Sequence, residues 1–153
     1  MEIERTLSLP GPAEQTFELV EDLSRYPRWM KLIHEVVELE PDLEGRRAWD
    51  VELRARVGPL ARSKRLRMIR TVHEISRSVV FERDEVDGRA HAPWVLRADL
   101  NPSVVSRDEV ELTMTLSYGG GLWTGAVLQR VLDDEVRQGS EALLAIVSSE
   151  PKR

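Results

Sequence analysis

Cysteine is absent from this chain of 153 residues, so disulfide bonds and thiolate metal sites are excluded. Aromatic residues are also scarce, at 5% of the chain, and positive charge is in the minority. The 22 Lys and Arg residues against 27 Asp and Glu residues leave a formal charge of −5, and the phosphate backbone of nucleic acids repels an acidic chain. We therefore expect no nucleic-acid partner.

Long apolar runs and internal repeats are missing as well. No stretch approaches the run of about 18 apolar residues that a membrane-spanning helix needs. The amino terminus is charged where a secretory signal needs an apolar segment. These absences predict a cytoplasmic protein with no integral membrane segment. The length suits a single domain over residues 1–153, which we expect to be a monomer or a homodimer.

The amino-terminal part of the chain predicts one strand followed by two short helices. Residues 2–9 mix apolar and polar positions in the manner of an edge strand, and Pro10-Gly11-Pro12 ends it. Residues 13–23 carry apolar side chains at helical spacing. Residues 24–30 predict a second short helix, with Ser24 as its N-cap.

The middle of the chain predicts six strands separated by clusters of Pro, Gly, Asn and Asp. Side chains alternate between apolar and charged through residues 49–57, and residues 110–118 alternate in the same way between apolar and polar. Each of these strands therefore has one dry face and one wet face. The expected strands span residues 33–40, 47–57, 62–74, 78–86, 91–100 and 104–118.

The last part of the chain predicts one long helix. The period of the apolar residues changes there from two to 3.6, and this pattern continues for about 25 residues. Hairpin-connected strands are antiparallel, and only the helices can cover their dry face. We therefore predict an α+β fold, in which a curved antiparallel sheet of about seven strands wraps around the carboxyl-terminal helix, with two short helices after the first strand.

This order of elements resembles the START-like, or SRPBCC, superfamily in its polyketide cyclase/dehydrase branch. The most specific motif is D-x-S-x-Y-P-x-W, from Asp22 to Trp29, and the likeness in element order covers essentially the whole chain. The resemblance implies a helix-grip fold with a deep apolar cavity between sheet and helix. It does not imply one reaction, since members of the superfamily include lipid carriers, polyketide cyclases, hormone receptors and quinone-binding proteins.

The inward side chains either fill a core or line a cavity, and alternation alone favours a filled core. The resemblance favours a cavity for a small hydrophobic molecule. Trp29 and Trp94 are the stronger candidates among the tryptophans, because an indole can stack on a flat ligand. The predicted ligand-binding residues are Trp29, Met30, Trp49, Leu53, Met68, Phe81, Trp94, Leu96, Leu112, Met114, Leu128, Leu132 and Val136.

Candidate catalytic residues are few. Arg70 shares the inward parity of Leu66 and Met68, and a buried guanidinium needs a carboxylate partner or an anionic ligand. A bulge near Ile69 turns Arg70 out to solvent instead, and we favour this interpretation. Tyr118 ends an inward row, where its phenol can donate to a ligand carbonyl or pack in the core.

The three histidines match no metal-ligand spacing, because 39 and 18 residues separate His34, His73 and His91. We predict neither a metal site nor a cofactor, and we expect His73 on the outer surface. The chain also has no Gly-x-Ser-x-Gly motif and no cysteine nucleophile.

Residues 54–70 form a strongly basic hairpin in an acidic chain. We expect a solvated outer face whose cations pair with Glu52, Glu109 and Glu111. The other interpretation is a contact with an anionic membrane or an acidic partner.

Two functions follow from these patterns. The first is binding of a lipid-like, polyketide-like or aromatic molecule in an internal cavity. The alternative is a polyketide cyclase or aromatase that holds a poly-ketone chain in a reactive fold, with positioning supplying much of the rate. In that case Arg70 and Tyr118 would polarise a carbonyl or assist its enolisation.

Overall fold

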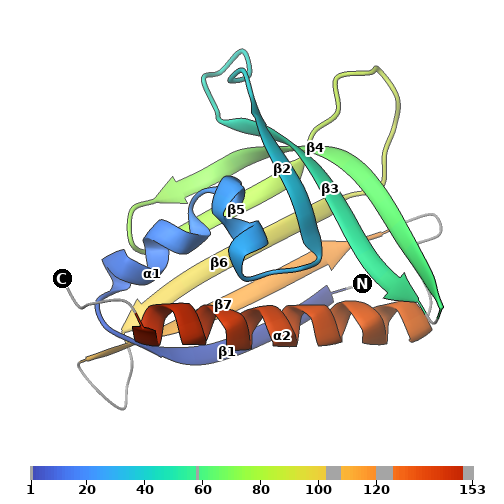
Figure 1. Cartoon of the computed structure of the whole chain (residues 1–153). Helices are drawn as coiled ribbons and strands as arrows, with labels where there is room; N and C mark the ends of the chain where they lie inside the picture. Colours follow the sequence, from blue (N-terminus) through green and yellow to red (C-terminus); the bar gives the residue numbers. More distant parts are fainter. Residues whose placement is uncertain (1, 58, 103–107, 120–125, 150–153) are drawn as a thin grey trace.

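The computed structural model describes residues 2–57, 59–102, 108–119 and 126–149, apart from the side chains of residues 57 and 126–128. The elements follow the predicted order of one strand, two short helices, six strands and one long helix (Figure 1). They are β1 (Glu2–Pro10), α1 (Ala13–Val20), the 3₁₀ helix η1 (Leu23–Arg28), β2 (Ile33–Leu39), β3 (Ala48–Val57), β4 (Leu60–Glu74), β5 (Ser78–Arg83), β6 (Trp94–Pro102), β7 (Glu109–Tyr118) and α2 (Ala126–Ser149).

The seven strands form one antiparallel sheet in the order β1-β7-β6-β5-β4-β3-β2. Strands β2 to β7 each lie beside their neighbours in the chain and run antiparallel to them, as successive hairpins do. Strand β1 lies at the edge of the sheet beside β7, where Ile3 pairs with Leu116 and Leu7 with Leu112. The predicted curved antiparallel sheet is confirmed, and β1 and β2 are its two edges.

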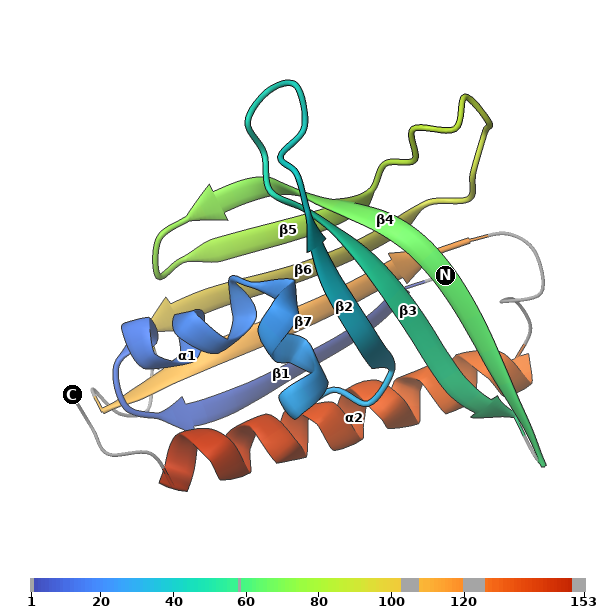
Figure 2. The ribbon, with the colours of Figure 1, turned by 45° about the horizontal axis from the view of Figure 1, so that its top comes forward.

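All three helices lie on one face of the sheet, and α2 runs across that face along its length (Figure 2). The reason is the alternation seen in the sequence: in β7 every second residue is buried, from Val110 to Tyr118. Strand β6 pairs with β7 in register, so that Leu96 lies opposite Leu116 on the same apolar face. The predicted helix-grip arrangement is therefore confirmed. None of the described helices combines the length and the apolar character that crossing a membrane requires.

The second short helix differs in detail from the prediction. It is a 3₁₀ helix that begins at Leu23, and its N-cap is Asp22 rather than Ser24. The Asp22 side chain accepts a hydrogen bond from the backbone N–H of Ser24, at 2.9 Å. Aspartate and serine are equally good N-cap residues, so the sequence pattern does not distinguish between them. The predicted N-cap therefore lies two residues too late.

Gly139 allows α2 to approach the end of η1 closely. A Cβ atom at this position would lie 3.2 Å from the carbonyl oxygen of Trp29 and 3.4 Å from the Cα of Met30. The partners are backbone atoms, which cannot rotate away as a side chain can. The distance between α2 and the segment that follows η1 therefore depends on a residue without a side chain.

We expect Gly139→Leu to lower the free energy of unfolding by about 1–3 kcal/mol, because the larger side chain overpacks this contact. Urea denaturation measures the change. Ala145→Leu is the matched control, since Ala145 is exposed on the same helix, and we expect it to change stability by less than about 0.5 kcal/mol. Equal effects of the two variants would show that the close approach is not needed.

Candidate ligand-binding cavity

A cavity lined by buried residues lies between the inner face of the sheet, the segment from η1 into β2, and α2. Its volume is about 30 Å³, and none of the described side chains around it carries a charge or a hydroxyl group. Five of the seven strands contribute to it, together with η1 and α2. The lining residues are Leu23, Met30, Leu32, Ile33, Val51, Leu53, Leu66, Met68, Trp94, Leu96, Leu116 and Val136.

Six of the predicted ligand-binding residues line this cavity: Met30, Leu53, Met68, Trp94, Leu96 and Val136. Six others are buried but contribute to the surrounding core instead: Trp29, Trp49, Phe81, Leu112, Met114 and Leu132. The side chain of Leu128 lies outside the described part of the chain. Strand parity alone places residues on the inner face, and it cannot tell which of them border the empty space.

The prediction omitted six lining residues, for two different reasons. Val51, Leu66 and Leu116 alternate in step with predicted ligand-binding residues on their own strands. The alternation therefore indicates that their side chains face inward. Leu23 lies in η1, Leu32 in the turn that follows it, and Ile33 at the irregular start of β2. Irregular segments have no repeating period, so their inward side chains leave no signal in the sequence.

The cavity is far smaller than the resemblance implies. A typical small-molecule pocket holds roughly 300–1,000 Å³, whereas this cavity has about 30 Å³. The long side chains of Met30, Met68 and Trp94 take up room between the sheet and α2. An empty apolar space of this size destabilises a fold by only about 0.7 kcal/mol, at about 24 cal/mol per Å³. The fold therefore tolerates it easily.

Four aromatic rings pack together beneath η1. The rings of Tyr26 and Trp29 are 4.6 Å apart, and Phe81 lies 5.9 Å from Tyr26 and 5.4 Å from Trp49 in edge-to-face contacts. Burial raises the pKa of the Tyr26 phenol, which donates a hydrogen bond to the carbonyl of Val20 at 2.8 Å. These residues attach η1 to the sheet, and this accounts for the position of Trp29 and Trp49 in the core.

The indole N–H groups of Trp29 and Trp49 differ in their partners. Trp29 donates to the carbonyl of Leu19 at 3.4 Å. Trp49 is fully buried, and its indole N–H has no hydrogen-bond partner among the residues that the structure describes. An unsatisfied buried donor costs about 1–3 kcal/mol. Its cross-strand neighbour Met68 lines the cavity, so this donor lies close to the cavity wall.

Tyr118 packs behind a residue of the cavity wall and does not line the cavity itself. Its ring stacks on Trp94 with the centroids 5.1 Å apart, and Trp94 in turn lines the cavity. Burial raises the pKa of the Tyr118 phenol. The structure therefore does not place the phenol among the groups that border the empty space.

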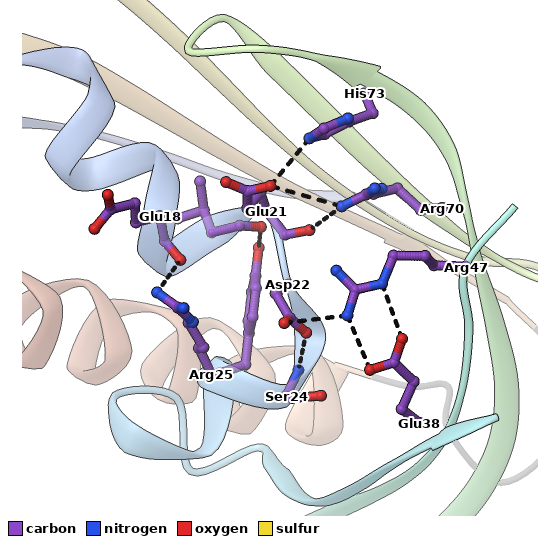
Figure 3. A network of polar contacts seen from close by, with 11 residues as sticks. Glu18, Glu21, Asp22, Ser24, Arg25, Glu38, Arg47, Arg70 and His73 are labelled. Carbon is purple, nitrogen blue, oxygen red and sulfur yellow. Dashed lines mark hydrogen bonds and ion pairs between the residues drawn. The ribbon is translucent and has the colours of Figure 1, made fainter.

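Arg70 lies on the helix-covered face of the sheet, and the expectation that it turns out to solvent is wrong. The bulge in β4 falls between Arg70 and Val72, just beyond Arg70, and not near Ile69. The guanidinium donates to the backbone carbonyl of Glu21 at 2.9 Å and lies 3.8 Å from the Glu21 carboxylate (Figure 3). Arg70 therefore has the carboxylate partner that a buried guanidinium needs, and it does not line the cavity.

The same bulge corrects the expectation for His73. One extra residue in a strand reverses the parity of every later side chain. His73 therefore points to the same side as Arg70, stacks on Phe17 at 5.6 Å and lies 3.1 Å from the Glu21 carboxylate. It is partly exposed at the rim of the covered face, not on the outer face of the sheet.

A polar network fastens α1 and η1 to the sheet. Besides Glu21, it contains Arg47 of the β2–β3 connection, whose guanidinium binds Glu38 at 2.9 Å and Asp22 at 3.3 Å (Figure 3). Burial by itself raises the pKa of the Asp22 carboxyl. The N–H of Ser24 and the charge of Arg47 outweigh burial and hold this pKa below its usual value. We call α1 and η1 together, residues 13–28, the cover segment.

The basic hairpin pairs with acidic residues, as expected, and Glu52 is one of the expected partners that it binds. Arg65 lies 2.8 Å from Asp50, 3.6 Å from Glu35 and 3.8 Å from Glu52. The expected partners Glu109 and Glu111 lie on β7, four strands away from β3. At about 4.8 Å per strand they are too distant to form ion pairs with it.

We expect Asp22→Asn to lower the free energy of unfolding by about 1 kcal/mol at neutral pH, because it removes the charge that Arg47 binds. Asparagine still caps η1, so the variant isolates the charge. The folded-state pKa of Asp22 is lowered, so its contribution is complete above the unfolded-state value, about 3.9. It is lost as the pH falls through the folded-state pKa.

Urea titrations at several pH values measure this effect. The difference between the wild-type protein and Asp22→Asn should close as the pH falls well below about 4. Asp50→Asn is the control, because Asp50 forms an exposed pair with Arg65 on the outer face. A difference for Asp22→Asn that stays constant at all pH values would contradict the role of the charge.

Comparison with solved structures confirms the fold. A START superfamily protein from Mycobacterium smegmatis is 16% identical over 96% of this chain and 97% of its own, with a TM-score of 0.73. The aromatase/cyclase Zhui from Streptomyces sp. R1128 is 14% identical over 97% of this chain and 93% of its own, with a TM-score of 0.65. These identities show the fold alone.

A di-domain protein is also similar. The ARO/CYC protein StfQ of the steffimycin biosynthetic pathway is 14% identical over 96% of this chain and 50% of its own, with a TM-score of 0.67. No curated protein matches the chain. The model of the family described as polyketide cyclase/dehydrase and lipid transport matches residues 9–144, from the end of β1 into α2. The chain therefore belongs to the polyketide cyclase/dehydrase and lipid transport family.

Proposed function

We propose that this protein binds a hydrophobic small molecule in the cavity between the sheet, the segment from η1 into β2, and α2. The observation that carries the proposal is a buried space whose described lining is entirely apolar, in a chain whose family is described as including lipid transport. A site of this kind recognises shape and apolar area rather than hydrogen-bonding groups. The buried part of the ligand is therefore lipid-like, polyketide-like or aromatic.

Binding must enlarge the cavity, because about 30 Å³ holds no more than one or two water molecules. Two of the walls can yield. Met30 and Met68 are unbranched and flexible, so they can change conformation at small cost. The polar contacts between the cover segment and the sheet are made by Glu21 and Asp22, near the middle of the segment. The end of η1 and the turn into β2 lie beyond these attachments.

The geometry supports binding more strongly than polyketide cyclisation. A cyclase needs polar groups that converge on the reacting carbonyl. Arg70 is bound to Glu21 and Tyr118 stacks behind Trp94, and neither lines the cavity. Cyclisation remains the alternative because two of the similar structures are aromatase/cyclases. The cytoplasmic location, the single domain and the monomeric or homodimeric state stay predictions from the sequence.

Titration with the neutral fluorescent probe N-phenyl-1-naphthylamine tests the proposal. We expect the wild-type protein to bind it and Val51→Phe to bind about tenfold more weakly, because the added ring occupies the cavity that Val51 lines. Val95→Phe is the matched control, since Val95 lies on the face of β6 that points away from the cavity. Near-UV circular dichroism shows whether each variant keeps its packed core.

Val51→Leu is a milder variant in case phenylalanine prevents folding, and its affinity should fall in the same direction. Equal affinity of the wild-type protein and a folded Val51→Phe would place the probe elsewhere. Failure of the wild-type protein to bind any neutral hydrophobic probe would overturn the proposed function.

A further inference from the structure

A basic groove lies directly outside the cavity. Its volume is about 440 Å³, and it lies between the turn into β2, the end of β3 and the middle of α2. Beyond Leu53, the last partner of β2, the edge of β3 has no neighbouring strand, which leaves room for the groove. The residues that matter for the argument are Lys31, Ile33, His34, Arg54, Arg56 and Glu135.

Ile33 connects the groove with the cavity. Its side chain lines both of them and is only 4% exposed. It lies on the first residue of β2, where the regular pairing with β3 is interrupted by a register shift between Ile33 and Glu35. One apolar side chain at an irregular strand end therefore borders both the solvent-filled groove and the dry interior.

The charges around the groove are unbalanced. Three cations, Lys31, Arg54 and Arg56, face one carboxylate, Glu135. Arg54 has a partner in Glu52, at 3.6 Å. In the described part of the chain, no carboxylate lies within ion-pair distance of Lys31 or Arg56.

Glu135 is a single carboxylate, so it does not cancel the charges of Lys31, Arg54 and Arg56 together. Elsewhere on the same hairpin, Arg65 lies among three carboxylates. Two cations without such partners, in a concave site on an acidic protein, create a local field that attracts an anion.

We propose that the groove binds the acidic head group of an amphipathic ligand, with Lys31 and Arg56 contacting the head and the apolar tail passing Ile33 into the cavity. The inference rests on the proposed function, since the tail occupies the cavity. It adds a chemical class: an apolar chain or ring system that ends in a carboxylate or a phosphate. Such a ligand satisfies both the unpaired cations and the apolar lining, whereas a neutral molecule satisfies only the lining.

Calorimetric titration with dodecanoate below its micelle concentration and dodecan-1-ol below its solubility limit tests the head-group site. The two probes share a tail and differ in charge. We expect dodecanoate to bind about tenfold more tightly at low salt, and this advantage should shrink as the ionic strength rises. Lys31→Gln and Arg56→Gln should each weaken dodecanoate binding about threefold to fivefold and leave the affinity for dodecan-1-ol unchanged.

Arg97→Gln is the control with the same change of net charge. The variants are compared at physiological salt, where the screening length is about 8 Å. Arg97 lies on β6, three strands from β3, which is about 14 Å and beyond that length. It should change neither affinity.

The outcomes separate the two proposals. If both probes bind equally and the lysine and arginine variants change nothing, the head-group site is wrong and the cavity proposal stands. If Arg97→Gln weakens dodecanoate binding as much as Arg56→Gln does, net charge explains the preference and the groove does not. If neither probe binds to the wild-type protein, the proposed function fails, and the head-group site fails with it.

Discussion

The alternation of apolar and polar side chains along the strands is the constraint on which the rest of this structure depends. It makes one face of a seven-stranded sheet apolar from β3 to β7, and such a face must be covered. Hairpin connections leave only the helices to do so. Sheet curvature and a straight helix of 24 residues do not match in shape, so space is left between them near Met68 and Val136.

The cover segment is held by a different kind of interaction. Its apolar side chains, such as Tyr26, attach it to the core, but its position depends on polar contacts with Arg47 and Arg70. These arginines lie on the covered face at the point where the apolar lining ends. Their role is to orient α1 and η1, and this role explains why two cations point inward without bordering the cavity.

The amino-acid pattern predicted the architecture well but the polar residues poorly. A periodic pattern is judged over many residues, so an error at one position does not change the prediction of the sheet or of α2. The facing of Arg70 and His73 depends on the position of a single bulge, and a shift of one residue reverses it. The bulge depends on how β4 and β5 fit together, and β4 by itself carries no signal for it.

By itself, the sequence determined which faces of the strands are apolar, how long the last helix is, and that the helices must cover the sheet. These properties follow from neighbouring residues through the fixed periods of strands and helices. Only the tertiary structure decided that the cavity is small, that Ile33 borders both the cavity and a basic groove, and that Lys31 and Arg56 both line this groove. Residues from η1, β3 and α2 come together only when the chain has folded, because no local period relates them.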